Sequence, residues 1–143
     1  MRAKLHHAPG WPAGNVVLPR LRAPLAEAEA MTAQRDALIS ERELAATVDA
    51  LAELHGWKAY GVLEQTVYAR RLSKGWPDRV FLRNGPGCSR LIFAELKSER
   101  GKLTPEQGEW LLALRLFAGD RDQAIEIYLW RPSDLDRIEE ILR

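Results

Sequence analysis

The sequence contains few of the residues that form crosslinks or thiolate metal sites. Its 143 residues include one cysteine, Cys88, and three histidines. A single cysteine excludes an intramolecular disulfide, and this composition fits a reducing compartment such as the cytoplasm. No apolar run approaches the roughly 18 residues that a membrane span needs, and no signal peptide is recognisable. We therefore expect one globular domain without crosslinks.

The sequence also lacks an excess of charge of either sign. Lysine and arginine together number 21, aspartate and glutamate 20, and the net charge is +1. Any affinity for nucleic acid must therefore come from local clusters of basic residues. The sequence has no P-loop, no Cys/His metal pattern, no Gly-x-Ser-x-Gly and no dinucleotide fingerprint. None of these motifs therefore offers a competing catalytic site.

The chain divides into an N-terminal arm, residues 1–39, and a domain, residues 40–143. Prolines and glycines are frequent in residues 1–24, which predicts an extended or disordered segment. Residues 25–38 are rich in alanine and glutamate and favour a helix. The arm therefore has no core of its own.

Local signals in the domain predict alternating strands and helices. Ser40 and Glu43 form a capping box that begins the first helix, and Thr104 and Gln107 form another. The expected elements are a helix at 40–56, strands at 57–62, 79–83 and 91–96, a helix from Thr104 with a buried stripe of Leu111, Leu112, Leu114 and Leu116, a strand at 124–130 and a final helix capped by Ser133. This α/β order, α-β-β-β-α-β-α, predicts a mixed sheet of about four strands flanked by helices.

The most informative stretch is residues 75–97, which reads as a strand, a turn at 84–89 and a second strand. If the hairpin is symmetric about this turn, Arg83 faces Arg90 and Asp78 faces Glu95. Directly opposed residues have Cβ atoms roughly 4.5–5.5 Å apart, and Lys97 emerges on the same face as Glu95. A slip of one residue would move Glu95 to the other face.

Two facing carboxylates repel each other, and a divalent cation between them removes the repulsion. Mg²⁺ suits such a site, because it prefers oxygen ligands and needs few carboxylates. The alternative is a hairpin with solvated acids at its ends, since charged residues are mostly surface residues.

Several words of the sequence, in this order, resemble the VRR-NUC family of PD-(D/E)xK nucleases. Pro77-Asp78 followed by Glu95-x-Lys97 is similar to the signature of the whole superfamily. The words that resemble VRR-NUC are Gly75-Trp76-Pro77-Asp78, Phe93-Ala94-Glu95-Leu96-Lys97-Ser98-Glu99, Leu103-Thr104-Pro105-Glu106-Gln107 and Tyr128-Leu129-Trp130-Arg131-Pro132. The resemblance covers about residues 40–143 and implies a restriction endonuclease-like core.

The resemblance implies a metal-dependent deoxyribonuclease. Asp78, Glu95 and the carbonyl of Leu96 would hold Mg²⁺ or Mn²⁺, and Lys97 would assist the chemistry. Gln107 would belong to the active site, although its capping role is equally available. An acid of the first helix, Glu41 or Glu43, would lie near the metal, and Glu43 has an alternative role in its capping box.

Basic residues near these acids are candidates for DNA contacts. Tyr68, Arg70, Arg71 and Lys74 precede Asp78, and Arg100 and Lys102 follow Lys97. The basic side chains could hold phosphates while Tyr68 stacks on a base or sugar. The alternative is a pair of solvated surface loops.

By resemblance we expect a structure-specific endonuclease that cuts branched DNA such as Holliday junctions, in a bacterial or phage-infected cell. A homodimer would supply two sites related by a two-fold axis, with Trp110, Leu112 and Leu116 as contacts and 25–38 as reinforcement. The alternatives are a monomer that processes flaps or ends and a nucleic-acid-binding module that does not cut.

Overall fold

The structure, a computed structural model, describes residues 22–61, 74–119 and 124–143. In chain order the elements are α1 (Arg22–Leu38), α2 (Glu41–Leu54), β1 (Lys58–Gly61), β2 (Arg79–Gly85), β3 (Cys88–Leu96), α4 (Pro105–Ala118), β4 (Ile125–Trp130), the 3₁₀ turn η1 (Pro132–Asp134) and α5 (Leu135–Leu142). The expected order of strands and helices is confirmed, and the segment preceding the domain contributes α1.

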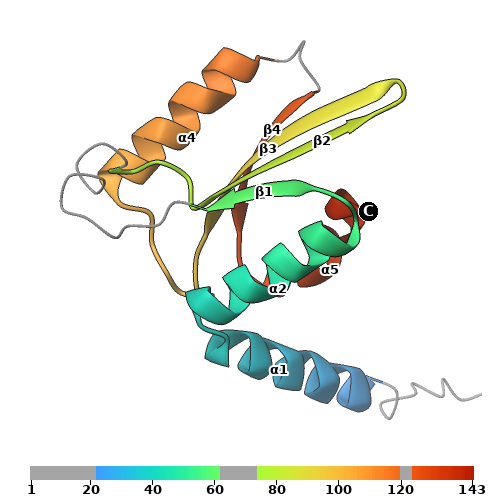
Figure 1. Ribbon diagram of the computed structural model, residues 1–143. Coiled ribbons are helices and arrows are strands. Elements are labelled where there is room, and N and C mark those ends of the chain that lie inside the picture. Colours follow the sequence, from blue (N-terminus) through green and yellow to red (C-terminus); the bar gives the residue numbers. More distant parts are fainter. Residues whose placement is uncertain (1–21, 62–73, 120–123) are drawn as a thin grey trace, which may run out of the picture.

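The four strands form one mixed sheet in the order β1-β2-β3-β4. β1 pairs with β2 and β2 with β3 in antiparallel fashion, whereas β3 and β4 are parallel. A parallel pair needs a crossover, and α4 provides it between β3 and β4. Figure 1 shows α4 on one side of the sheet and α2 with α5 on the other.

The predicted register of the central hairpin is confirmed. Arg83 pairs with Arg90, and the outermost pair is Arg79 with Ala94, so Asp78 and Glu95 come next along the two strands. The turn is shorter than the predicted 84–89, because pairing continues to Gly85 and Cys88. Only Pro86 and Gly87 remain for the reversal. Proline fixes φ near −65°, and Gly87 adopts a φ of 77°, which suits glycine.

The hydrophobic core lies on the sheet face that α2 and α5 cover. The core residues of β3, namely Ile92, Ala94 and Leu96, alternate along the strand, as expected for side chains on one face of a pleated strand. The core consists of Leu44, Val48 and Ala52 from α2, Trp57, Phe81, Ile92, Ala94, Leu96 and Trp130 from the sheet region, and Ile138 and Leu142 from α5. Burial of each large aliphatic side chain stabilises the fold by about 1.5–3 kcal/mol.

The predicted buried stripe of α4 is wrong in part. Leu111 is buried, but Leu112 and Leu116 are 59% and 75% exposed. Successive helical residues are rotated by about 100°, so these leucines cannot share one face with Leu111. The second buried residue of α4 is Ala118, seven positions after Leu111 and therefore on the same side.

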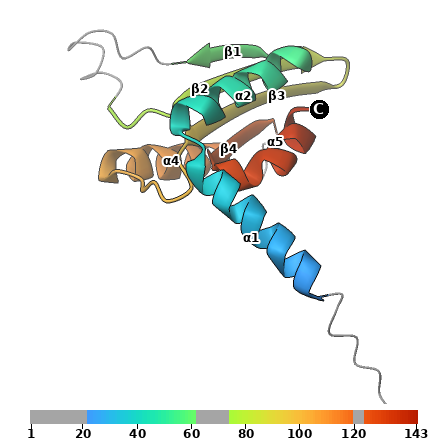
Figure 2. The same ribbon diagram turned by 90° about the horizontal axis from the view of Figure 1, so that it is seen from below.

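α1 projects away from the sheet, and the C-terminal end of α1 contacts the domain (Figure 2). Asp36 is buried there, although it belongs to the segment expected to lack a core. The predicted cap of the final helix is also wrong. The Ser133 hydroxyl donates a hydrogen bond to Glu99 at 3.0 Å, and α5 begins after η1. None of the helices in the described ranges is long and apolar enough to cross a membrane.

Candidate active site

The candidate site lies where the ends of two strands meet the start of α4. Asp78 directly precedes β2, Glu95 is the next-to-last residue of β3, and Lys97 follows β3. Gln107 lies in the first turn of α4, which begins at this end of the sheet and runs back along one of its faces. The structure therefore brings all four predicted catalytic residues to one edge of the sheet.

Glu95 is the centre of the site and is fully buried. Its Oε1 accepts a hydrogen bond from Gln107 Nε2 at 2.5 Å and lies 2.7 Å from Lys97 Nζ. Its Oε2 is also buried and has no hydrogen-bond partner among the described residues. An unpaired buried carboxylate oxygen is costly, so this atom is available to a ligand.

Asp78 is held at the end of the neighbouring strand. Its Oδ2 accepts a hydrogen bond from the backbone N–H of Leu96 at 2.8 Å, which bridges the two strands beyond their last pair. The adjacent Arg79 makes a two-pronged ion pair with Asp49 of α2, at 2.8 and 3.0 Å. These contacts fix the backbone on both sides of the Asp78 carboxylate.

The environment favours the neutral form of Glu95. Burial, together with the charge of Asp78, raises the pKa of its carboxyl to about 7, although the Lys97 ammonium and the nearby Asp78 N–H act to lower it. Burial lowers the pKa of Lys97, but Glu95, Glu41 and Asp78 outweigh that effect and raise the pKa overall. Lys97 is therefore a buried cation surrounded by three acids.

Gln107 closes its predicted capping box and at the same time contacts Glu95. The Thr104 N–H donates to Gln107 Oε1 at 2.9 Å, and the Gln107 N–H donates to Thr104 Oγ1 at 3.3 Å, which closes the capping box. The other end of the amide, Nε2, donates to Glu95. The start of α4 is thus tied directly to the candidate site.

The structure separates the two acids of the first helix. Glu41 Oε1 accepts a hydrogen bond from the Ser98 N–H at 3.2 Å, and its charge acts on Lys97. Glu43 binds Ser40, through the backbone N–H at 2.8 Å and the hydroxyl at 2.7 Å. Glu41 therefore lies beside the site, and Glu43 is engaged in its capping box.

The predicted DNA contacts are only partly described. Arg100 and Lys102 are exposed on the loop between β3 and α4. Lys74 is exposed and forms an ion pair with Glu106. Tyr68, Arg70 and Arg71 lie outside the described residues.

Arg131 is a site-supporting residue that the sequence did not reveal. Its Nη1 donates to the carbonyls of Ser98 and Glu99, at 2.7 and 3.1 Å, and so holds the loop that follows Lys97. The available signal was its position directly after β4, whose Trp130 pairs with Leu96. In a parallel pair the residues after both strands leave the sheet at the same edge.

Two glycines allow close approach of the backbone around the site. A Cβ on Gly75 would lie 2.5 Å from the backbone carbon of Glu106, and its φ of +81° also disfavours other residues. A Cβ on Gly101 would lie 2.9 Å from Ser98 Oγ and 3.1 Å from Glu41 Oε1. The loops before Asp78 and after Lys97 are therefore packed against their neighbours.

The residues present fit a hard divalent cation. Asp78 and Glu95 supply carboxylate oxygens, and the buried Glu95 Oε2 has no competing partner among the described residues. No group of three or more His, Cys, Asp or Glu side chains suited to a metal occurs in the described part of the chain. A site here would therefore rest on two carboxylates and backbone or solvent oxygens, which is a coordination that Mg²⁺ accepts.

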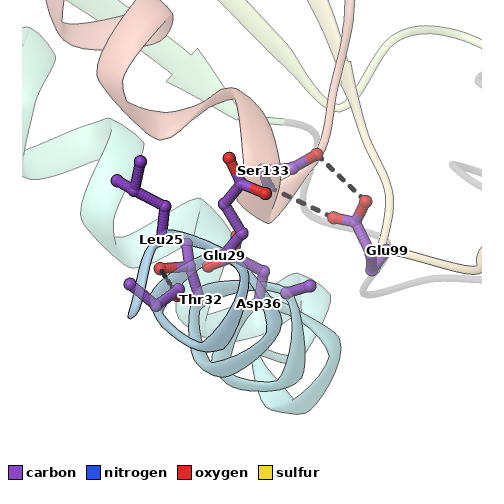
Figure 3. Close-up of a pocket in the computed structure, with 8 residues that line it drawn as sticks. Leu25, Glu29, Thr32, Asp36, Glu99 and Ser133 are labelled. Atoms are coloured by element: carbon purple, nitrogen blue, oxygen red, sulfur yellow. Dashed lines mark hydrogen bonds between the residues drawn. The ribbon is translucent and has the colours of Figure 1, made fainter. Parts of the chain in front are cut away.

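A separate cavity of about 470 Å³ lies between α1 and the part of the domain that carries Glu99 and Ser133 (Figure 3). Its lining includes three acids, Glu29, Asp36 and Glu99, and none of the four candidate catalytic residues. Glu99 faces Ser133 in this cavity, to which it is hydrogen-bonded. The cavity is therefore distinct from the candidate active site.

Comparisons with models of known families, with curated proteins and with solved structures find no match for this chain.

Proposed function

We propose that this protein is a metal-dependent endonuclease that hydrolyses DNA phosphodiester bonds on a PD-(D/E)xK-type fold. The observation that carries the proposal is the buried Glu95 carboxylate. It is bound by Lys97 and Gln107 on one oxygen and unpartnered among the described residues on the other. Such an arrangement is costly for a structural role and useful for binding a cation.

Asp78, Glu95 and the backbone carbonyl of Leu96 would hold Mg²⁺ or Mn²⁺. When bound, the cation would polarise the scissile phosphate and lower the pKa of a water molecule. Glu41 lies close enough to Lys97 to affect its pKa, and it is the acid of α2 that could assist the site.

Lys97 supplies a fixed positive charge. Its Nζ is held 2.7 Å from Glu95 Oε1, and the residue is 8% exposed. A charge that is oriented before the reaction and screened from water stabilises the negative charge that develops on a phosphate more strongly than a mobile surface lysine would.

Gln107 also keeps Glu95 in position, through the same oxygen that Lys97 contacts. Because its amide also closes the cap of α4, rotation of Glu95 toward Gln107 is blocked by a rigid helix end. Glu95 Oε2 is then the oxygen directed toward a ligand. Arg100 and Lys102 are exposed on the next loop and would contact DNA phosphates beside the site.

A cleavage assay tests the proposal. Linear, nicked, flap and four-way-junction DNA would each be incubated with the protein in Mg²⁺, in Mn²⁺ and in EDTA. We expect cleavage in either metal, none in EDTA, a preference for branched DNA and products with 5′-phosphates. Preference for flaps or ends would indicate the monomeric processing enzyme, and binding without cleavage on any substrate would contradict the proposal.

A further inference from the structure

A second pocket, of about 310 Å³, lies beside the candidate active site. In the described part of the chain it is lined by Lys74 and by four residues of α4, namely Glu106, Glu109, Trp110 and Ala113. These four occupy positions i, i+3, i+4 and i+7 and so form one side of the helix. Lys74 lies four residues before Asp78, and Glu106 directly precedes Gln107, so both walls of the pocket continue into the active site.

The two walls are fixed to each other. Gly75 packs against the backbone of Glu106 so closely that a Cβ would lie 2.5 Å from its carbonyl carbon. Lys74 Nζ forms an ion pair with Glu106. The pocket therefore keeps a constant position relative to Asp78 and Gln107.

The indole of Trp110 is oriented in advance. Its Nε1–H donates to the Lys74 carbonyl at 3.1 Å, and its ring contacts Trp76 edge to face, with centroids 4.8 Å apart. Trp76 makes a similar contact with Phe93 of β3. Trp110 is nevertheless 37% exposed. An indole that is fixed at its polar end but still accessible can stack on a flat ligand with little loss of side-chain freedom.

The charges of the pocket favour a base over a phosphate. It carries two carboxylates and one ammonium, and the ammonium is paired with Glu106. Glu109 has no ion-pair partner among the described residues. A carboxylate repels a phosphate but accepts a hydrogen bond from the exocyclic amino group of a base, as in recognition of cytosine N4.

We propose that this pocket binds one unstacked DNA base next to the scissile phosphate. The base stacks on Trp110, and its amino group donates to Glu109. Cytosine, adenine and guanine each carry an exocyclic amino group that fits this chemistry, whereas thymine has none. The inference rests on the proposed nuclease function and gives it a source of selectivity, because a base near a branch point leaves the stack at lower cost than one inside a duplex.

An abasic scan of the cleavage substrate tests the pocket. Single abasic positions would be placed one at a time on both sides of the cut in a four-way junction. For the wild-type protein, we expect one position to lower kcat/KM about tenfold or more, the order of a base–aromatic stack. Trp110→Ala should lose a similar factor on intact DNA and be insensitive to that abasic position. Trp110→Phe should retain most of the activity, and Phe117→Ala, which removes an exposed ring of α4 outside the pocket, should match the wild type.

A binding measurement in EDTA separates the two hypotheses. Fluorescein-labelled octamers of deoxycytidine and of thymidine would be titrated with the full chain and followed by anisotropy. We expect deoxycytidine to bind about fivefold more tightly, and Glu109→Ala to remove this preference, since one hydrogen bond to a charged group is at stake. A Glu109-dependent preference, with binding that Trp110→Ala weakens, in a protein that cleaves nothing would support the pocket and contradict the nuclease proposal.

Three results would overturn the pocket. One is cleavage that depends on neither Trp110 nor any abasic position, which would leave the nuclease proposal intact. Another is that the wild type and Trp110→Ala bind both octamers with the same affinity. The third is a change of molar mass in Trp110→Ala by light scattering, which would show that this surface contacts a second copy of the chain instead.

Discussion

Glu95 and Lys97 form an ion pair in a place where charge is costly. Both side chains are buried, and Glu95 is fully so. Breaking a buried pair from one side typically costs about 3–5 kcal/mol, because the remaining charge loses its partner. The alternative interpretation of the hairpin, with solvated acids at its ends, is therefore wrong for Glu95. A substitution of Lys97 would therefore lower the stability of the fold as well as the proposed cleavage activity.

Asp78→Asn is the cleaner test of the site. An asparagine oxygen can still accept the Leu96 N–H, so the strand ends keep their connection. The variant loses the negative charge that would hold a cation, and we expect cleavage to fall on the order of 10²-fold, with a melting temperature near that of the wild type. Asp136→Asn, on the exposed surface of α5, is the matched control. Cleavage by Asp78→Asn at the wild-type rate would show that Asp78 is not part of the active site.

The raised pKa of Glu95 predicts a dependence of stability on pH. Its pKa is about 7 in the folded protein, against an ordinary value of 4.5. The unfolded chain therefore releases this proton at lower pH than the folded chain, and the contribution of Glu95 to the free energy of unfolding falls as pH rises from about 4.5 to about 7.

Urea unfolding in EDTA between pH 5 and pH 8 measures this effect. Glu95→Gln carries no titrating group at this position, so its stability should fall less over the same interval. Mg²⁺ should raise the stability of the wild type more at pH 8 than at pH 5, since a cation binds the charged carboxylate. Identical pH profiles for the two proteins would contradict the assigned pKa.

At the level of the elements, the two capping boxes form a natural pair for comparison. Ser40–Glu43 begins α2 and Thr104–Gln107 begins α4, with the same four hydrogen-bonding groups in each. The difference is that Gln107 also binds Glu95. One cap is therefore structural, and the other also holds the candidate site.

Glu43→Ala and Gln107→Ala separate these roles. Loss of a cap costs about 0.5–2 kcal/mol, so both variants should unfold more easily by similar amounts in urea. Cleavage should fall at least about tenfold for Gln107→Ala alone, because only there does Glu95 lose a partner. Comparable cleavage by both variants would show that Gln107 acts only as a cap.

The features that were predicted from the sequence are those with local signals. The hairpin register follows from Pro86-Gly87 and from alternation in two adjacent strands, and both caps follow from residues three positions apart. The face that becomes buried depends on neighbours from distant parts of the chain. The leucines of α4 illustrate this. Leu112 and Leu116 are as apolar as Leu111, but they are exposed whereas Leu111 is buried.

The same limit applies to the site. Asp78, Glu95, Lys97 and Gln107 could be selected from their spacing and from the family resemblance, whereas the burial of Lys97 could not. Charged residues are seldom buried, and this one is buried because Glu95, Glu41 and Asp78 surround it. Arg131 was missed because its contacts are to backbone carbonyls, and only its position directly after β4 pointed to the site.

At the scale of the whole molecule, the two faces of the sheet have different tasks. One face packs against α2 and α5 and contains most of the buried apolar residues. The other carries Phe93, Glu95 and the contact with α4, and it leads to the candidate site. Substitutions in the first face should therefore change stability, and those in the second should change activity first.

The exposed side of α4 bears on how many copies of the chain act together. Leu112 and Leu116, one turn apart, are both more than half exposed. Since Trp110 belongs to the proposed base pocket, the expected dimer contact narrows to these two leucines. A four-way junction has two equivalent strands to cut, one chain supplies one site, and an isologous dimer supplies two through a single self-complementary surface.

We therefore predict a homodimer that requires Leu116. Light scattering at micromolar concentration should give twice the 16.2 kDa of one chain. Leu116→Glu places a charge in the contact and should yield the monomer mass together with loss of junction cutting. Leu54→Glu, which adds the same charge at an exposed position of α2 outside the expected contact, should remain dimeric. A wild-type protein of monomer mass that still resolves junctions would exclude the dimer, and flap or end cleavage by a monomer would then be the function to pursue.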